Sequence, residues 1–192
     1  MSFKVLVVPE DHTHNGAILK PLLQDVVADA GKTSASIKVL DNPRVQGFDQ
    51  AMTAIRGELV ERYRWMDLWL FMPDADRAGD ASMRDLEATL AARGVWLLCC
   101  PARPEVEIFA CAPYRDSLKL PWDEARQHPS FKEDVFHALL VQHGDDRRPS
   151  GGRDLMIGAA LSNLPLLYQL CPELKLLRDR IAAGPPSLQA SR

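Results

Sequence analysis

The stretch Phe3-Lys4-Val5-Leu6-Val7-Val8-Pro9 decides the fold class of this chain. It is short, rich in β-branched residues and ended by a proline, which is typical of a strand buried on both faces. Strands of this kind belong to parallel sheets that helices cover on both sides. The next segment, 15–31, has apolar residues at spacings of one, three and four and ends at a glycine. It therefore predicts an amphipathic helix packed on the strand.

Strand and helix signals alternate through the first hundred residues. The pattern predicts further strands at 36–40, 68–72 and 95–100, and helices at 48–64 and 82–93, the second with Ser82 as its N-cap. This order predicts an α/β fold, in which a Rossmann-like parallel sheet of about four strands is flanked by helices. In such a sheet ligands bind beyond the carboxyl ends of the strands.

The second half of the chain has a different, helical pattern. A short helix is expected near Pro104, and longer helices are expected at 131–143, 153–170 and 172–183. We therefore divide the chain into an α/β core, a helical extension packed on that core, and a flexible tail. The corresponding residue ranges are 1–112, 113–184 and 185–192.

Composition excludes several classes of protein. The 192 residues are 46% apolar and 26% charged, which fits one folded domain better than a disordered chain or a coiled coil. No apolar run reaches the roughly 20 residues of a membrane span, so we expect a cytoplasmic protein that does not enter a membrane. The net charge of −3 excludes a generally basic nucleic-acid binder. The four cysteines lack C-x-x-C spacing and are expected to be reduced core thiols.

Acidic residues follow two of the predicted strands. Glu10 and Asp11 come directly after the first strand, and Asp74-Ala75-Asp76 follows the strand at 68–72. Carboxylates that converge at one edge of a sheet repel each other unless a cation lies between them, and Mg²⁺ or Mn²⁺ prefers oxygen ligands. The pattern is compatible with a metal site, and also with carboxylates that cap helices or are solvated in loops.

Taken together, these two segments resemble the signature motifs of TOPRIM-like proteins. The similarity is closest to small stand-alone members related to the OLD-type nucleases. In this family the first strand ends in a Glu, usually within Glu-Gly-x-Thr-Glu, and a later strand ends in Asp-x-Asp. Glu10 and Thr13 match the first motif, and Asp74 and Asp76 match the second. The resemblance covers roughly residues 3–112.

One further match and three departures refine the resemblance. The segment from Pro104 to Ala110 is similar to a Pro-Glu-x-Glu-x-Trp segment of several relatives, which adds Glu107. His14 stands where a second carboxylate is common; imidazole suits Mn²⁺ better than Mg²⁺, so the second metal position is altered or absent. Asp11 stands where the family has Gly, which can change the geometry of the turn. Where OLD-type enzymes use a late Lys, this chain offers Arg153, which can neutralise a phosphate but cannot act as a general base.

The resemblance implies a metal-dependent nuclease or phosphoryl-transfer domain that acts on nucleic acid. Glu10, Asp74 and Asp76 would hold Mg²⁺ or Mn²⁺, Glu107 and His14 would serve a second position, and Arg153 would offset charge in the transition state. Relatives of this kind look like parts of phage-defence or mobile-element systems and often work with an ATPase. This chain lacks the pattern G-x-x-x-x-G-K-[ST], so the ATPase would be a separate partner protein.

Two other functions stay open at this point. The altered first motif is compatible with a catalytically inert TOPRIM-like module that binds a partner protein. An Asp-x-Asp after a strand also occurs as the metal-nucleotide ligand of glycosyltransferases, although 192 residues hardly accommodate their acceptor domain. The sequence predicts no particular oligomeric state.

Overall fold

A four-stranded, all-parallel sheet forms the centre of the molecule, in a computed structural model that describes residues 2–11, 15–75 and 79–185. The strand order is β2-β1-β3-β4, so β1 and β3 are neighbours although a strand and three helices separate them in the chain. Pro9 at the end of β1 is in register with Met72 at the end of β3. The predicted α/β class is confirmed, with strands β1 (Lys4–Pro9), β2 (Ser36–Val39), β3 (Leu68–Met72) and β4 (Leu97–Cys99).

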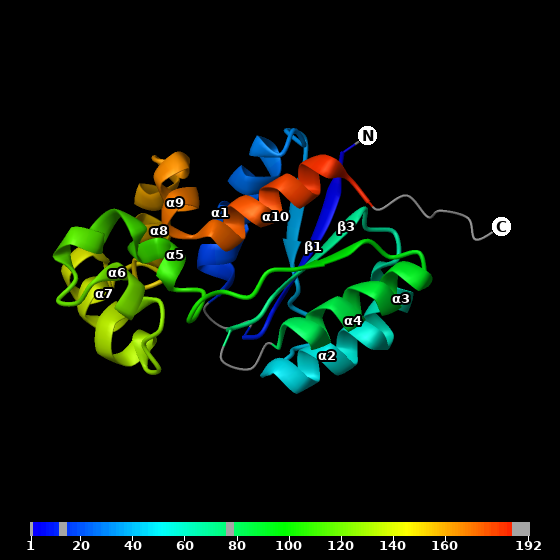
Figure 1. The fold of residues 1–192 in the computed structure, drawn as a ribbon, viewed down its shortest axis with the longest axis horizontal. Coiled ribbons are helices and arrows are strands. Elements are labelled where there is room, and N and C mark those ends of the chain that lie inside the picture. The colour runs from blue at the N-terminus through cyan, green and yellow to red at the C-terminus, as the bar shows by residue number, and fades with distance from the viewer. Residues whose placement is uncertain (1, 12–14, 76–78, 186–192) are drawn as a thin grey trace.

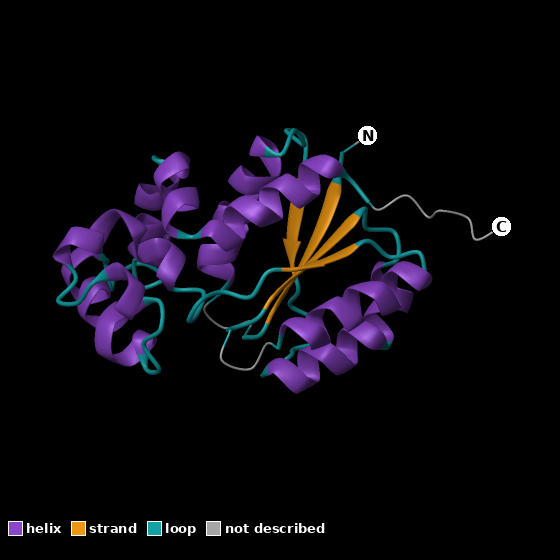
Figure 2. Ribbon diagram, viewed as in Figure 1, coloured by secondary structure: helices purple, strands orange, loops and turns teal. Residues whose placement is uncertain are grey.

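Helices cover both faces of the sheet, as Figures 1 and 2 show. Val5 and Val7 of β1 point into the core beneath α1 (Gly16–Asp29) and α10 (Pro172–Ala183). Leu6 and Val8 point the opposite way, because side chains alternate along a strand. The helices on that second face are α2 (Phe48–Arg56), α3 (Glu58–Tyr63) and α4 (Asp80–Ala92).

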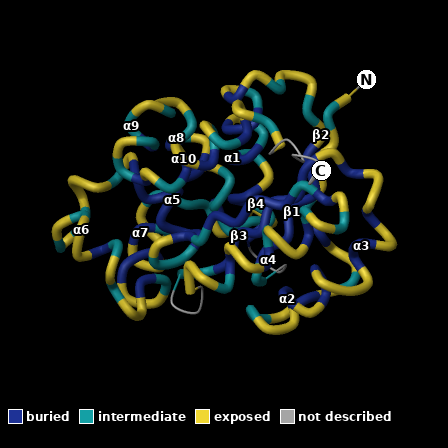
Figure 3. Tube along the Cα trace, turned by 45° about the vertical axis from the view of Figure 1, so that its right-hand side comes forward, coloured by how far each residue is buried: buried dark blue, intermediate teal, exposed yellow. Residues whose placement is uncertain are grey.

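The remaining helices gather beyond one end of the sheet, on the left of Figure 1, before α10 returns across it. Their apolar side chains join the core on the α1 side, where Ile18, Met156 and Leu177 belong to one buried cluster. Figure 3 shows this interior as a dark blue trace, with the exposed residues on the outer turns. These elements are α5 (Ile108–Cys111), α6 (Trp122–Ala125), α7 (His137–His143), α8 (Arg153–Leu161), α9 (Leu164–Leu170), the 3₁₀ segment η1 (Ala112–Ser117) and the π-helical turn η2 (Lys132–Phe136).

Several predicted helices differ from the structure at their ends or in their middle, and three of these differences have a clear local description. The helix expected at 48–64 is interrupted at Gly57, which separates α2 from α3. The helix expected at 153–170 breaks before α9 because Pro165 has no N–H and its ring clashes with the preceding turn. The helix expected at 82–93 begins at Asp80, and Ser82 is not its N-cap; the Ser82 hydroxyl donates to the carbonyl of Gly79 inside the first turn.

Expectations about membrane-spanning helices and about the state of the cysteines both came from the composition. Within the described ranges, every helix is too short or too polar to cross a bilayer. All four cysteines are buried free thiols, as predicted, and burial raises the pKa of each. Apart from Pro185, the predicted tail lies outside the described residues.

Candidate functional site

The carboxyl ends of β1 and β3 bring Glu10 and Asp74 into contact. The backbone N–H of Asp74 donates to Oε2 of Glu10 at 3.1 Å, although 64 residues separate the two. The contact follows from the register of the sheet, since two neighbouring parallel strands end at the same level there. The structure therefore confirms that these two strands are neighbours with matching ends.

The segment that follows β4 is hydrogen-bonded to the segment that follows β3, which contains Asp74. Asp74 pairs with Ala102 in a parallel bridge, and the Ala75 N–H donates to the carbonyls of Ala102 and Pro104 at 2.9 and 3.0 Å. The Val106 N–H in turn donates to Oδ1 of Asp74 at 3.2 Å. These hydrogen bonds hold the segment that contains Glu105 and Glu107 against the end of β3.

The Asp74 carboxyl is largely buried among other acids. Burial raises its pKa, and the nearby carboxylates of Glu10, Glu107 and Glu105 raise it further, to about 7. The hydrogen bond from Val106 acts in the opposite direction but does not compensate. Burial is thus the larger cause of the raised pKa, and the converging carboxylates add to it.

Among the described residues, Glu107 is the one charged residue that is buried, with 2% of its surface exposed. The ammonium of Lys132 lies 3.2 Å from its Oε1. This is an ion-pair distance, although Oε1 accepts no well-directed hydrogen bond from the described residues. Lys132 belongs to no motif in the sequence, and within the described ranges its ammonium is in contact with Glu107.

The described contacts of Arg153 are with Ser150 and Phe136, and not with the acidic residues. Its guanidinium donates to the carbonyl of Ser150 at 3.1 Å and lies over the ring of Phe136, 5.5 Å from its centre. Among the described residues it forms no ion pair with an acid. The predicted role of Arg153 in offsetting charge thus has no support from its contacts.

The other selected residues cannot be placed. Asp76 and His14, together with Thr13, lie outside the described residues. Within the described part of the chain, no group of three or more His, Cys, Asp or Glu side chains is arranged to hold a metal ion. Glu10 and Asp74 are suitable oxygen ligands at the right edge of the sheet, so a metal fits this site only if a further ligand joins them.

A pocket of about 710 Å³ opens beside Asp74. Its wall includes Glu105, Arg103, Arg126 and His128. Arg126 is not free to bind a ligand, because Glu173 accepts two hydrogen bonds from it at 3.1 and 2.9 Å. The pocket gives a molecule in solution direct access to the Asp74 end of the acidic group.

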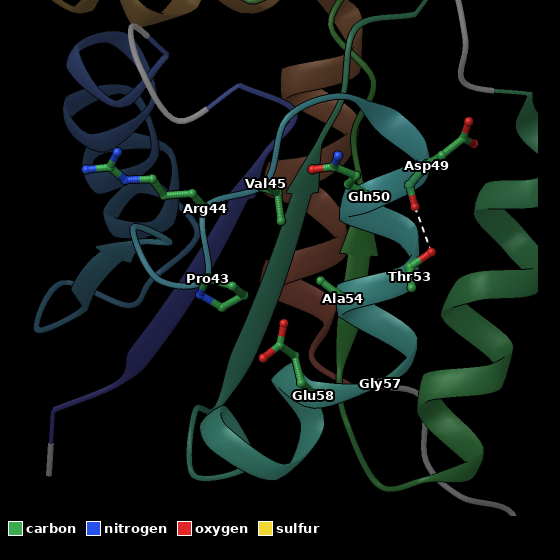
Figure 4. Close-up of a pocket in the computed structure, with 9 residues that line it drawn as sticks. All are labelled: Pro43, Arg44, Val45, Asp49, Gln50, Thr53, Ala54, Gly57 and Glu58. Atoms are coloured by element: carbon green, nitrogen blue, oxygen red, sulfur yellow. Dashed lines mark hydrogen bonds between the residues drawn. The ribbon is translucent and has the colours of Figure 1, made fainter.

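A second pocket, of about 530 Å³, lies between the loop at 43–45 and α2 (Figure 4). Its charged members, Arg44, Asp49 and Glu58, are all exposed. The hydrogen bond drawn in Figure 4 joins the Thr53 hydroxyl to the carbonyl of Asp49 within one turn of helix. The residues that line this pocket include no buried titratable group, in contrast to the pocket beside Asp74.

Comparisons of the chain with protein-family models, with curated proteins and with solved structures found no match.

Proposed function

We propose that this protein is a divalent-metal-dependent nuclease or phosphoryl-transfer domain of the TOPRIM type, acting on nucleic acid. The observation that carries the proposal is the contact between Glu10 and Asp74 at the ends of two neighbouring parallel strands. This edge of an open α/β sheet is where ligands bind. Burial and, after it, the nearby carboxylates raise the pKa of Asp74, and a divalent ion would relieve the part that comes from the carboxylates.

Glu10 and Asp74 would hold Mg²⁺ or Mn²⁺ with oxygen ligands, and Asp76, which lies outside the described residues, would be a further ligand. When bound, such an ion polarises a phosphodiester and lowers the pKa of a water molecule. Asp74 is half-buried and lines the neighbouring pocket, through which a substrate would approach the ion. The ammonium of Lys132, rather than the guanidinium of Arg153, is placed to offset negative charge.

The alternative is an inert TOPRIM-like module that binds a partner protein. Two observations favour it: the described carboxylates do not form a group of three, and Glu107 already has a cation beside it. The proposed link to phage defence or mobile elements, and to a separate ATPase, is based on the sequence resemblance.

Metal binding tests the proposal directly. At about 100 times its Kd, Mn²⁺ should stabilise the wild type by about 2.7 kcal/mol, measured as a shift of the unfolding transition. The Asp74→Asn, Asp76→Asn double variant should lose this shift and keep its fold. Asp123→Asn, an exposed acid on the wall of the same pocket, is the matched control and should keep the shift.

Activity is measured with end-labelled single-stranded and double-stranded DNA and with RNA, in Mg²⁺, in Mn²⁺ and in EDTA. Cleavage that requires the ion and disappears in Glu10→Gln supports the nuclease. An equal Mn²⁺ shift in the wild type and the double variant would reject the metal site. Absence of any shift, with partner binding intact, would favour the inert module.

A further inference from the structure

The pairing of Glu107 with Lys132 bears on how many ions the proposed site holds. Glu107 is the most deeply buried acid of the group, and its Oε1 lies 3.2 Å from the Lys132 ammonium. Lys132 keeps 34% of its side chain exposed, so the ammonium reaches inward from the surface. The ion pair therefore places a positive charge directly beside the Glu107 carboxylate.

The core fixes both ends of this ion pair. Glu107 precedes α5, in which every residue from Ile108 to Cys111 is fully buried. Lys132 is the first residue of the π-helical turn η2; Phe131, which precedes the turn, and Phe136, its last residue, are both buried. Turns of this kind are rare and often occur at functional sites, because they direct a side chain that a regular helix would direct elsewhere.

The charge state of Lys132 agrees with this geometry. Burial lowers the pKa of Lys132, but the carboxylates of Glu107, Glu105 and Asp11 outweigh that effect and leave the pKa above its ordinary value. Lys132 is thus an ammonium at neutral pH, attracted by three acids at once. A divalent ion in contact with the same Glu107 oxygen would meet this positive charge at close range.

We propose that the Lys132 ammonium takes the place of a second cation at Glu107, so that the site binds one divalent ion, from the side of Glu10 and Asp74. This inference rests on the proposed function and makes it more specific. Glu107 and Lys132 then act as a positioning pair, which keeps the segment 104–107 against Asp74 without ligating the ion.

The test is the number of Mn²⁺ ions bound per full-length chain, by isothermal titration and by electron paramagnetic resonance. We expect one ion in the wild type and no signal from coupled ion pairs. Lys132→Met removes the ammonium and should raise the number from one to two, with the coupled signal appearing. Adding Glu107→Gln to this variant should return the number to one.

Two controls separate the role of Lys132 from a general change of charge. Lys132→Arg keeps the cation and should keep one ion. Lys119→Met removes an exposed lysine of the same helical extension and should also leave one ion. If Lys132→Met does not fold, as judged by circular dichroism, the counts for the wild type and Lys132→Arg still test the inference.

Failure of the inference differs from failure of the proposed function. Two ions in the wild type, or a single ion in folded Lys132→Met, would overturn the role of Lys132 and leave the metal site in place. No Mn²⁺ binding and no thermal shift in the wild type would overturn the proposed function, and the inference with it.

Discussion

The backbone N–H of Asp74 donates to the carboxylate of Glu10, and the carboxylate of Asp74 accepts from the N–H of Val106. Asp74 thus connects the segment that follows β1, through its backbone N–H, with the segment that follows β4, through its side-chain carboxylate. The backbone N–H of Asp74 stabilises the negative charge of the Glu10 carboxylate. The side chain of Asp74, in contrast, lies near the carboxylates of other acids. The raised pKa of Asp74 contributes to the pH dependence of the protein's stability.

The first prediction concerns Asp74→Asn in EDTA. The pKa of Asp74 is about 7 in the folded state against an ordinary value of 3.8, so the folded state holds a proton that the unfolded state releases between these pH values. Wild-type stability should therefore fall as pH rises from about 4 to about 7. The asparagine variant avoids this loss and should be more stable above pH 7, by a few kcal/mol at most.

Urea unfolding at pH 5 and pH 8 measures the effect. The difference between the variant and the wild type should be small at pH 5 and clear at pH 8. Asp123→Asn, the exposed control, should show no such change with pH. A difference independent of pH would mean that Asp74 is already ionised in the folded protein at pH 5.

The second prediction concerns the stability of the pair Glu107 and Lys132. Removing one partner of a buried ion pair leaves the other charge uncompensated, so Lys132→Met should destabilise the fold by about 2–4 kcal/mol. Combining it with Glu107→Gln should cost less than the sum of the single changes. A double-mutant cycle in urea should give a coupling of at least about 1 kcal/mol, and additive effects would show that the contact contributes little.

The third prediction concerns the open edge of the sheet. The Glu87 carboxylate accepts the N–H of Cys99 on edge strand β4 and also pairs with Arg180 of α10, both at 2.6 Å. Glu87→Ala leaves that N–H without its acceptor and should cost about 2 kcal/mol, while Glu87→Gln should recover part of the loss. Asp85→Ala, an exposed acid of the same helix, should change stability by less than about 0.5 kcal/mol. Equal losses in the two alanine variants would reject the edge contact.

The fourth prediction concerns His14, which lies outside the described residues. If His14 reaches the same ion as Glu10, binding should prefer Mn²⁺ over Mg²⁺, because imidazole suits the softer ion. His14→Glu should then move the preference toward Mg²⁺. Titration of both proteins with both ions measures this, and an unchanged ratio of the two Kd values would remove His14 from the site.

The strands and the Glu10–Asp74 edge were predictable because their signals are local. An apolar run ended by proline marks a buried strand wherever it occurs, and parallel strands align their carboxyl ends. The interruption at Gly57 was harder to predict, since the apolar spacing continues across it. Periodicity reports which side of a helix is buried, and it does not report whether the helix is continuous.

The contacts of the positively charged residues Arg153 and Lys132 could not be predicted from local sequence signals. Arg153 follows two glycines and matched a position in a motif, but tertiary packing places it over Phe136. Lys132 belongs to no motif, and its approach to Glu107 depends on a π-helical turn and on buried neighbours across the core. Long-range electrostatic partners of this kind follow from the packing of elements that are distant in sequence.

The return of α10 across the sheet has a consequence for how the protein is made. Leu174, Leu177 and Ile181 of this helix belong to the same buried cluster as Val5 and Val7 of the first strand. On the ribosome, β1 emerges long before α10 is synthesised, so one side of the nascent sheet stays uncovered during most of translation. The growing chain is therefore most exposed to aggregation, and most in need of a chaperone, until its last described helix is released.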